Sequence, residues 1–244
     1  MAYNFGVGNL YITPTTANAT PVLVGVLKDV SVSTSFEQKS LYGQFQFPID
    51  SARGQGKISI KCKNALINGG TIYSVLAGAT PTVGSEIGVA NESATVPATS
   101  PYTKVVSNGA TFKSDLGIYN VTKAKFMQRG SSVGSNTYTV NETTGTYTFD
   151  SGNSGDVLQI SYSYTSTTVG YTTSLSNQLM GAGTTFGVKL FNQFKSNNFG
   201  IYLYAVTFNK FDMGLKQSDY TEQDLEGEAF ASATGKIVDF FTAD

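Results

Sequence analysis

The chain has 244 residues, a formal net charge of −1 at pH 7 and only 14% charged residues, and it contains no histidine. A charge this close to zero excludes bulk electrostatic attraction to nucleic acid or to an anionic membrane. The lack of histidine excludes Ser-His and Cys-His nucleophile pairs, an imidazole base and histidine metal sites, so we expect a protein that is not an enzyme and has no cofactor. The length allows one large all-β domain or two small ones, and the many Gly and Tyr residues suit short strands and turns.

The single cysteine, Cys62, excludes an internal disulfide and a thiolate metal cluster. It continues the apolar face formed by Ile58 and Ile60, so we interpret it as a buried structural thiol rather than a nucleophile. No apolar leader follows Met1, and no apolar run approaches the roughly 20 residues of a membrane-spanning helix. We therefore expect a soluble chain that is made in the cytoplasm and has no membrane partner.

The first quarter of the chain predicts strands. An apolar run at residues 21–27 suits a strand buried on both faces, and residues 28–37 and 57–63 alternate strictly. Alternation with a period of two predicts two strands that each have one buried and one solvent-facing side. The solvent-facing sides of these two arms carry a serine row and a basic row, namely Ser31, Ser33, Ser35, Lys57, Lys61 and Lys63.

Residues 39–56 connect the two arms. Connectors of this length are usually functional or disordered. This one carries Leu41, Tyr42, Phe45 and Phe47, which make it too apolar for a solvated loop. We therefore expect these four side chains to lie in a contact between subunits.

Residues 64–78 change to helical spacing. Leu66, Gly70, Tyr73 and Leu76 follow one another at intervals of three or four, and the segment ends at a glycine. Asn64 suits the N-cap, so the spacing predicts one amphipathic α-helix of about three turns.

The composition shifts near residue 93. Residues 93–169 predict a series of short strands at 104–106, 123–127, 138–140, 147–149 and 157–164, with linker-like segments at both ends. We interpret 93–169 as an inserted β-domain, which makes residues 1–92 and 170–244 a discontinuous core domain. The alternative is that these strands extend the main sheet.

The last third returns to the core. Residues 186–194 alternate, residues 199–208 are apolar on both faces and predict a central strand, and an acidic stretch follows. Its carboxylates stand two residues apart, at Glu222, Asp224, Glu226 and Glu228. On a strand this spacing puts them in one row, about 6.5–7 Å apart.

The acidic row has several interpretations. Its beginning resembles a calcium-binding EF-hand loop, but Ala233 stands where a bidentate glutamate is needed. A glycosidase pair would need isolated carboxylates, and the chain has no tryptophan platform. A solvated strand face is the simple alternative. Because like charges in a row repel one another, the row should face open water or basic partners.

Two glycine-rich segments and the basic row are weak binding signals. Residues 51–57 lack the first Gly and the Ser/Thr of a phosphate-binding loop, and residues 181–187 lack the other kinase motifs, so both predict turns. The basic row and nearby Arg53 have no stacking aromatic residues for nucleic acid. Their complementarity to the acidic row instead suggests pairing between adjacent subunits or strands.

The run from Phe36 to Pro48, FEQKSLYGQFQFP, followed by Ala52-Arg53-Gly54 and Gly56-Lys57, resembles the amino-terminal hairpin region of tail tube (major tail) proteins of tailed bacteriophages. The resemblance continues through residues 64–78 and returns at 179–230. It implies a mainly β fold, with a β-sandwich or barrel-like core, one flanking α-helix and an inserted small β-sandwich-like domain as outer decoration.

The resemblance also implies hexameric rings that stack into a hollow tube, made in the host cytoplasm and located in the virion. Expected partners are other copies of the chain, the tape-measure protein, tail terminator and baseplate or tip proteins, a sheath protein in a contractile tail, and passing double-stranded DNA without sequence-specific binding. The acidic row would line the lumen, or in the alternative lie at a subunit interface. The lumen candidates are Glu222, Asp224, Glu226, Glu228, Ser31, Ser33 and Ser35, and the inter-subunit or inter-ring candidates are Leu41, Tyr42, Phe45, Phe47, Arg53, Lys57, Lys61 and Lys63. The competing function is a carbohydrate-binding or adhesion module.

Overall fold

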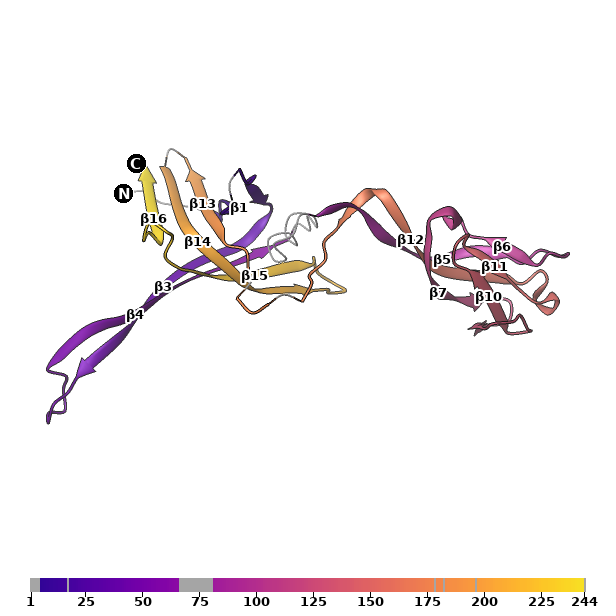
Figure 1. The fold of residues 1–244 in the computed structure, drawn as a ribbon, viewed down its shortest axis with the longest axis horizontal. Helices are drawn as coiled ribbons and strands as arrows, with labels where there is room; N and C mark the ends of the chain where they lie inside the picture. Colours follow the sequence, from indigo (N-terminus) through magenta and orange to yellow (C-terminus); the bar gives the residue numbers. More distant parts are fainter. Residues whose placement is uncertain are drawn as a thin grey trace. The chain divides into compact units, whose positions relative to one another are not determined.

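The computed structural model describes residues 5–16, 18–65, 81–177, 179–181, 183–195 and 197–243. The fold is mainly β, and the chain divides into two compact units (Figure 1). Unit 1 comprises Met1–Pro81 and Thr173–Asp244, and unit 2 comprises Thr82–Thr172. Each unit has its own hydrophobic core.

Unit 1 is one eight-stranded sheet organised by a long strand, β14. The first part of β14 pairs with β13 on one side and β16 on the other, and its second part pairs with β15. The order is β2-β1-β13-β14-β15-β4-β3, with β16 beside β14. The strands are β1 (Asn9–Pro14), β2 (Val22–Val24), β3 (Leu27–Leu41), β4 (Asp50–Asn64), β13 (Phe186–Phe194), β14 (Asn197–Gly214), β15 (Glu222–Ala229) and β16 (Val238–Ala243).

The sheet of unit 1 has two parts that share one core. We call β2, β1, β13, β16 and the first part of β14 the β1 half-sheet, and the second part of β14 with β15, β4 and β3 the β15 half-sheet. Their inward side chains form one buried cluster that includes Leu10, Ile12, Ile60, Cys62, Val188, Leu203, Val206 and Leu225. The two half-sheets therefore stabilise each other by burying apolar surface between them.

The hairpin of β3 and β4 continues beyond the sheet. Strand β15 pairs with β4 only from Ile58 to Asn64, so among the described strands the farther part, residues 35–57, pairs with itself alone. We call residues 35–57 the ribbon; in Figure 1 it leads away from the other strands of unit 1. The connector expected over residues 39–56 is therefore mostly strand, because β3 reaches Leu41 and β4 begins at Asp50.

Two further expectations for unit 1 were wrong. The apolar run 21–27 forms only a three-residue strand at the sheet edge, with Leu23 exposed, instead of a strand buried on both faces. Asn64 does not cap a helix: it is the buried last residue of β4 and pairs with Gln223 and Leu27. The rest of the expected helix lies at residues 66–78, outside the described residues, and in the described segments no α-helix is formed. The flanking helix is thus not borne out.

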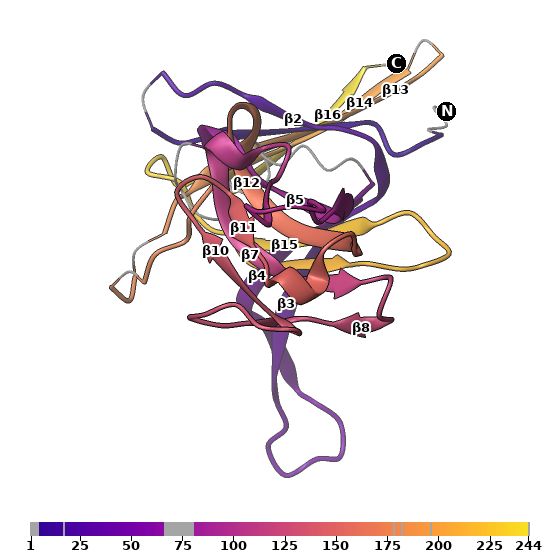
Figure 2. The same cartoon turned by 90° about the vertical axis from the view of Figure 1, so that its right-hand side faces the viewer.

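Unit 2 has two four-stranded sheets, β6-β11-β10-β9 and β5-β12-β7-β8; Figure 2 labels β10 and β11 of the first sheet and all four strands of the second. The expected insert, 93–169, lies inside this unit, and both of its limits fall within the long paired strands β5 and β12. The strands are β5 (Thr82–Thr95), β6 (Thr103–Val105), β7 (Phe112–Asn120), β8 (Lys125–Phe126), β9 (Gln128–Arg129), β10 (Thr137–Asn141), β11 (Thr146–Thr148) and β12 (Val157–Thr172). Two short 3₁₀ turns, η1 (Gly109–Thr111) and η2 (Ser151–Asn153), complete the unit.

Candidate assembly surfaces

The acidic row lies on one face of β15, as its spacing predicts. The intervening Gln223, Leu225 and Gly227 are buried, while the four carboxylates are partly exposed. Strand β15 has β4 on one side and β14 on the other. The row is therefore flanked by two strands whose outward side chains determine its electrostatics.

Lysines of the same chain pair with three of the four carboxylates. The Lys28 ammonium lies 2.6 Å from Glu222, Lys57 lies 2.5 Å from Glu228, and Lys61 lies 3.2 Å from Glu226. Lys210 of β14 approaches Glu226 from the other side at 3.5 Å. Lys57 and Lys61 of the basic row therefore pair with carboxylates of the acidic row across the adjacent strands β4 and β15.

These pairs shift the acid–base equilibria of exposed groups. The hydrogen bond from Lys28 lowers the pKa of Glu222, and the same contact raises the pKa of Lys28. The hydrogen bond from Lys61 lowers the pKa of Glu226. Because all three groups are exposed, solvent screens the pairs and their contribution to stability is small.

The serine row continues the pattern on β3. Ser31 stands opposite Lys61, Ser35 stands opposite Lys57, and the hydroxyls of Ser33 and Ser59 are 2.7 Å apart. We call this outward side of the β15 half-sheet the charged face. It carries six carboxylates and five ammonium groups, so its charge is nearly balanced: Asp29, Asp212, Glu222, Asp224, Glu226, Glu228, Lys28, Lys57, Lys61, Lys63 and Lys210.

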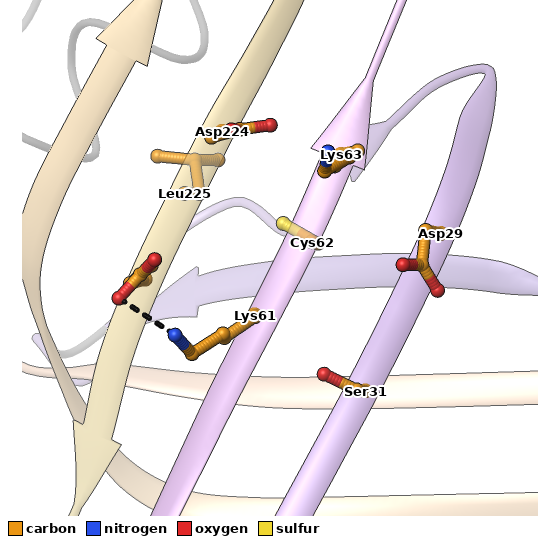
Figure 3. A pocket seen from close by; sticks show the side chains of 8 residues that line it. Asp29, Ser31, Lys61, Cys62, Lys63, Asp224 and Leu225 are labelled. Atoms are coloured by element: carbon orange, nitrogen blue, oxygen red, sulfur yellow. Dashed lines mark ion pairs between the residues drawn. The ribbon is translucent and has the colours of Figure 1, made fainter.

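A shallow depression of about 110 Å³ lies on the charged face (Figure 3). Asp29, Ser31, Lys63 and Asp224 line it, and Lys61 reaches across from β4 toward β15. Beneath it, burial raises the pKa of the Cys62 thiol to about 12, with a smaller effect from Asp224. Such a thiol stays protonated at neutral pH and is a poor nucleophile, in agreement with the structural role inferred from the sequence.

The outer end of the ribbon is an apolar tip, which we define as residues 41–49. Leu41, Tyr42, Phe45 and Phe47 are 59%, 52%, 63% and 79% exposed. Backbone hydrogen bonds from Ile49 to Leu41 (2.7 Å) and from Phe45 to Tyr42 (3.3 Å) close the loop. Arg53 lies on the ribbon, with its guanidinium 4.8 Å from the ring centre of Phe36. The tip thus presents large apolar side chains on a folded loop.

Sequence reasoning missed an aromatic surface on the β1 half-sheet. Residues 199–208 were expected to be buried on both sides, but only one side of this part of β14 faces the core, and Tyr202 and Tyr204 point outward. We call the outward side of the β1 half-sheet the aromatic face. Its main side chains are Tyr11, Lys189, Phe191, Tyr202, Tyr204 and Phe241. The sequence did not show which side of this strand faces solvent, because the tyrosines that alternate with Ile201 and Leu203 are also large and partly apolar.

Polar contacts fix the tyrosines of this face. The rings of Tyr202 and Tyr204 are 4.3 Å apart, and the Lys189 ammonium lies 4.8 Å from the Tyr202 ring centre. The Tyr204 hydroxyl donates a hydrogen bond to Asp239 and accepts one from Lys236 (3.3 Å). The bond to Asp239 is the main cause of a raised Tyr204 pKa. The aromatic face is therefore held rigid by side chains of three strands.

Unit 2 contains two polar clusters that stabilise its fold. The Asp115 carboxylate accepts hydrogen bonds from the hydroxyls of Tyr138 (2.7 Å) and Tyr147 (2.9 Å). Burial, together with Asp115, raises the pKa of both tyrosines. The cluster joins β7 to β10 and β11, and so links the two sheets of the unit.

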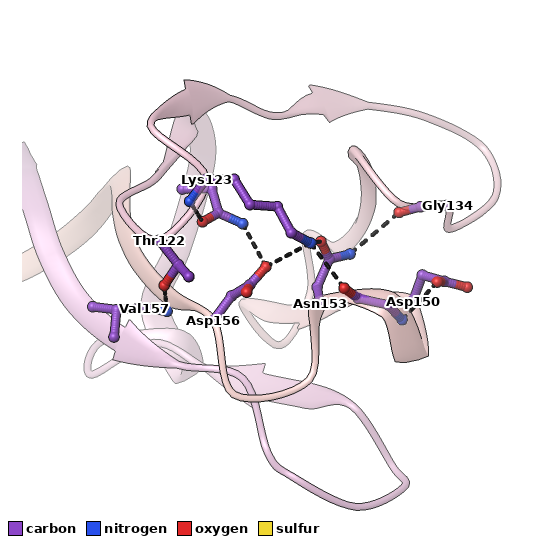
Figure 4. Close-up of polar contacts among 9 residues, drawn as sticks. Thr122, Lys123, Gly134, Asp150, Asn153, Asp156 and Val157 are labelled. Carbon is purple, nitrogen blue, oxygen red and sulfur yellow. Dashed lines mark hydrogen bonds and ion pairs between the residues drawn. The ribbon is translucent and has the colours of Figure 1, made fainter.

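The second cluster surrounds Lys123 (Figure 4). Its ammonium donates to the Gly152 carbonyl, to Asn153 Oδ1 and to Asp156, each at 2.8 Å. Buried Asn120 donates to the same Asp156 carboxylate at 2.7 Å. The hydrogen bonds from Lys123 and Asn120 outweigh the desolvation of Asp156 and lower its pKa. The sequence gave little signal for this cluster because its members come from two distant turns.

Neither cluster nor face forms a metal site. Across the described ranges there is no group of three or more His, Cys, Asp or Glu side chains placed to hold a metal ion. No helix in those ranges is long and apolar enough to cross a membrane. Comparison of the chain with protein-family models gave no match, and comparison with curated protein sequences also gave none.

Proposed function

We propose that this chain is a structural, non-enzymatic subunit of a phage tail tube, which assembles as hexameric rings stacked into a hollow conduit in the virion. The observation that carries the proposal is the apolar tip on a ribbon without neighbours. An isolated two-stranded ribbon is marginally stable in water, and exposed apolar patches of this kind mark protein contacts. Assembly would remove the tip from water and support the ribbon.

The open edge of β3 also supports assembly. Strand β3 has fifteen residues and pairs with β4 alone among the described strands. A long unpaired edge is a template for another strand, and proteins that stay monomeric usually shorten, cover or charge such edges. In the proposed ring, strands of neighbouring copies close these edges into a continuous barrel.

The charged face is the proposed wall of the lumen. Its serine row and acidic row would face the tape-measure protein during assembly and double-stranded DNA during ejection. Because lysines of the same chain balance the carboxylates, the wall would be nearly neutral rather than strongly acidic. DNA would then find no net positive surface to which it could adhere. Tail terminator and baseplate or tip proteins, and a sheath in a contractile tail, would meet the ends and the outside of the tube.

Electron microscopy of the purified protein tests the proposal. We expect rings or tubes for the natural chain, and monomers for a Tyr42→Ser/Phe45→Ser variant that keeps its circular dichroism spectrum. A natural chain that remains monomeric at high concentration, or a variant that forms tubes as readily, would contradict the proposal. Leu116→Ser in unit 2 changes an equally exposed apolar residue and is the matched control.

An adhesion or carbohydrate-binding role is the second candidate, and one observation on unit 2 favours it. Tyr119 and Phe126 form an edge-to-face pair with ring centres 5.0 Å apart, and Phe126 is exposed. Tyr119 stands beside the uncharged Gln159 on β12, which pairs with Ser93 of β5. Aromatic rings beside amide and hydroxyl groups suit a neutral sugar. Binding to a glycan array that is lost in Phe126→Ala would support this role, while a chain that assembles into tubes and binds no glycan would oppose it.

A further inference from the structure

We infer that the tip of one copy docks on the aromatic face of a second copy. This inference rests on the proposed function in one respect, that copies of the chain assemble. The tip and the aromatic face both present large, partly exposed aromatic side chains of unit 1.

The described strands of unit 1 do not cover the tip. Among them, residues 35–57 pair only with each other, and the tip side chains stay more than half exposed. The ribbon leads away from the remaining strands of unit 1 (Figure 1). The described strands of its own unit therefore leave the tip open to contact by a second copy.

The charged face is a poor receptor for the tip. Docking there would remove several carboxylates and ammonium groups from water, and the side chains of the tip offer them no charged partner. Desolvating a paired charge without a new partner is unfavourable. The tip contains Tyr42, Phe45 and Phe47, which gain most from contact with other aromatic and apolar groups.

The aromatic face offers such groups. A Cβ atom added to Gly200 would lie 2.9 Å from the Phe191 ring and 3.2 Å from the Phe241 ring, so these two rings cover the glycine from both neighbouring strands. Phe191 and Phe241 are 37% and 45% exposed. Beside them lie the tilted ring pair Tyr202 and Tyr204, and the ammonium of Lys189 can interact with an incoming ring. Aromatic residues concentrated on a rigid surface are typical of the central part of protein interfaces.

Because the two surfaces differ, the contact is heterologous. Each copy would give its tip to one neighbour and receive the tip of another, and such contacts build closed rings or open stacks instead of symmetric dimers. Both components are already ordered: the tip loop is closed by its own hydrogen bonds and the tyrosines are held by Asp239 and Lys189. Docking of ordered partners loses little conformational entropy.

Site-directed disulfide formation tests the contact. A Phe45→Cys chain is mixed either with a Phe191→Cys chain, which carries the thiol on the aromatic face, or with a Ser31→Cys chain, which carries it on the charged face. We expect a covalent dimer in the first mixture and none in the second after mild oxidation. The native Cys62 does not compete, because it is buried and its thiol stays protonated. A dimer with Ser31→Cys, or no dimer in either mixture, overturns the inference.

A second measurement guards against misfolded variants. Phe191→Ser/Phe241→Ser should raise the concentration needed for assembly at least about tenfold, as expected when central aromatic contacts are lost. The control Val105→Ser/Leu116→Ser, which changes two exposed apolar residues of unit 2, should leave it unchanged. Near-ultraviolet circular dichroism checks that both variants are folded. If the variant of the aromatic face is not folded, the disulfide experiment alone tests the docking site.

The inference and the proposed function fail in different ways. If electron microscopy shows tubes but the disulfide forms with the charged face, the tube function is supported and the proposed docking site is contradicted. If the disulfide forms with the aromatic face but no rings or tubes form under any condition, the docking site is supported and the tube function is contradicted.

Discussion

The two units satisfy their charged and polar groups in opposite ways. In unit 2, Asp115, Lys123 and Asp156 are at least partly buried and hydrogen-bonded within closed clusters. In unit 1, the acidic and basic rows stay on a solvent-facing surface and pair in an exposed ladder. Burial strengthens an electrostatic contact and makes its loss expensive, whereas water weakens an exposed one. The polar groups of unit 2 therefore hold a fold together, while those of unit 1 set the charge of a surface.

The same difference applies to the apolar residues. Unit 2 places three large aromatic side chains, Tyr138, Tyr147 and Tyr162, fully inside its core. Unit 1 buries Phe186 in its core but leaves the aromatic rings of the tip and Phe191 and Phe241 of the aromatic face exposed. Exposed aromatic side chains that gather on one surface, as on the tip and on the aromatic face, suit that surface to assembly.

The largest effect on stability should come from Asp115. Asp115→Ala leaves the hydroxyls of Tyr138 and Tyr147 without their acceptor, so we expect a loss of about 2–4 kcal/mol in the stability of unit 2. Asp115→Asn keeps one acceptor oxygen and should lose less. Urea unfolding followed by hydrogen exchange at the amides of β10 and β11 measures the effect. Equal losses in the two variants would contradict an acceptor role.

The next effect should come from the Lys123 cluster. Lys123→Met keeps the length of the side chain but leaves the carboxylate of the buried Asp156 with the hydrogen bond from Asn120 alone among the contacts described above, which should cost about 1.5–3 kcal/mol. Lys125→Met, two residues away on exposed β8, is the matched control and should be neutral. If both variants unfold at the same urea concentration as the natural chain, the cluster does not stabilise unit 2.

The same cluster predicts a dependence on pH. Folding lowers the pKa of Asp156, so its contribution is fully present above the unfolded pKa, which is about 4, and is lost as the pH falls through the lower folded pKa. Unit 2 should therefore lose stability as the pH falls below about 4, and Asp156→Asn should remove part of this slope. An unchanged slope in that variant would assign the acid sensitivity to other carboxylates.

The sequence predicted those strands that bury one side. The strands at Glu222–Ala229 and at residues 57–63 were predicted because a strand with one buried face alternates apolar and polar residues. The outer part of the hairpin and most of β5 were missed because neither of their sides is buried there, so no periodicity marks them. Strand β7 was missed because Asp115 contacts Tyr138 and Tyr147 where an apolar residue would continue the pattern.

The candidate surfaces were predictable to different degrees. The apolar character of the tip and the opposite charges of the two rows can be recognised from the spacing of residues within short segments of the sequence. The aromatic face could not be found in this way, because it is assembled from β1, β13, β14 and β16, and only the register brings Phe191, Gly200 and Phe241 together. Surfaces that depend on long-range pairing leave no local pattern.

The smallest effect on stability should come from the acidic row, whose exposed ion pairs contrast most with the buried polar clusters of unit 2. Changing Glu222, Asp224, Glu226 and Glu228 to Gln or Asn removes four negative charges and leaves the lysines of the charged face unbalanced. The formal charge of the chain changes from −1 to +3. Because the pairs are exposed, we expect unfolding to change less than in any variant above, and the change to fade as salt is added.

If the charged face lines a lumen, this variant should still form tubes, but its wall would attract DNA and slow ejection, with an effect that falls as salt rises. If the face lies between subunits, the same change should weaken the rings. Lys57→Gln/Lys61→Gln/Lys63→Gln is the matched control: it makes the wall more acidic and should leave ejection as fast as in the natural chain. A quadruple variant that both assembles and releases DNA normally would place the row away from the channel and from other subunits, and would show that its pairing serves unit 1 alone.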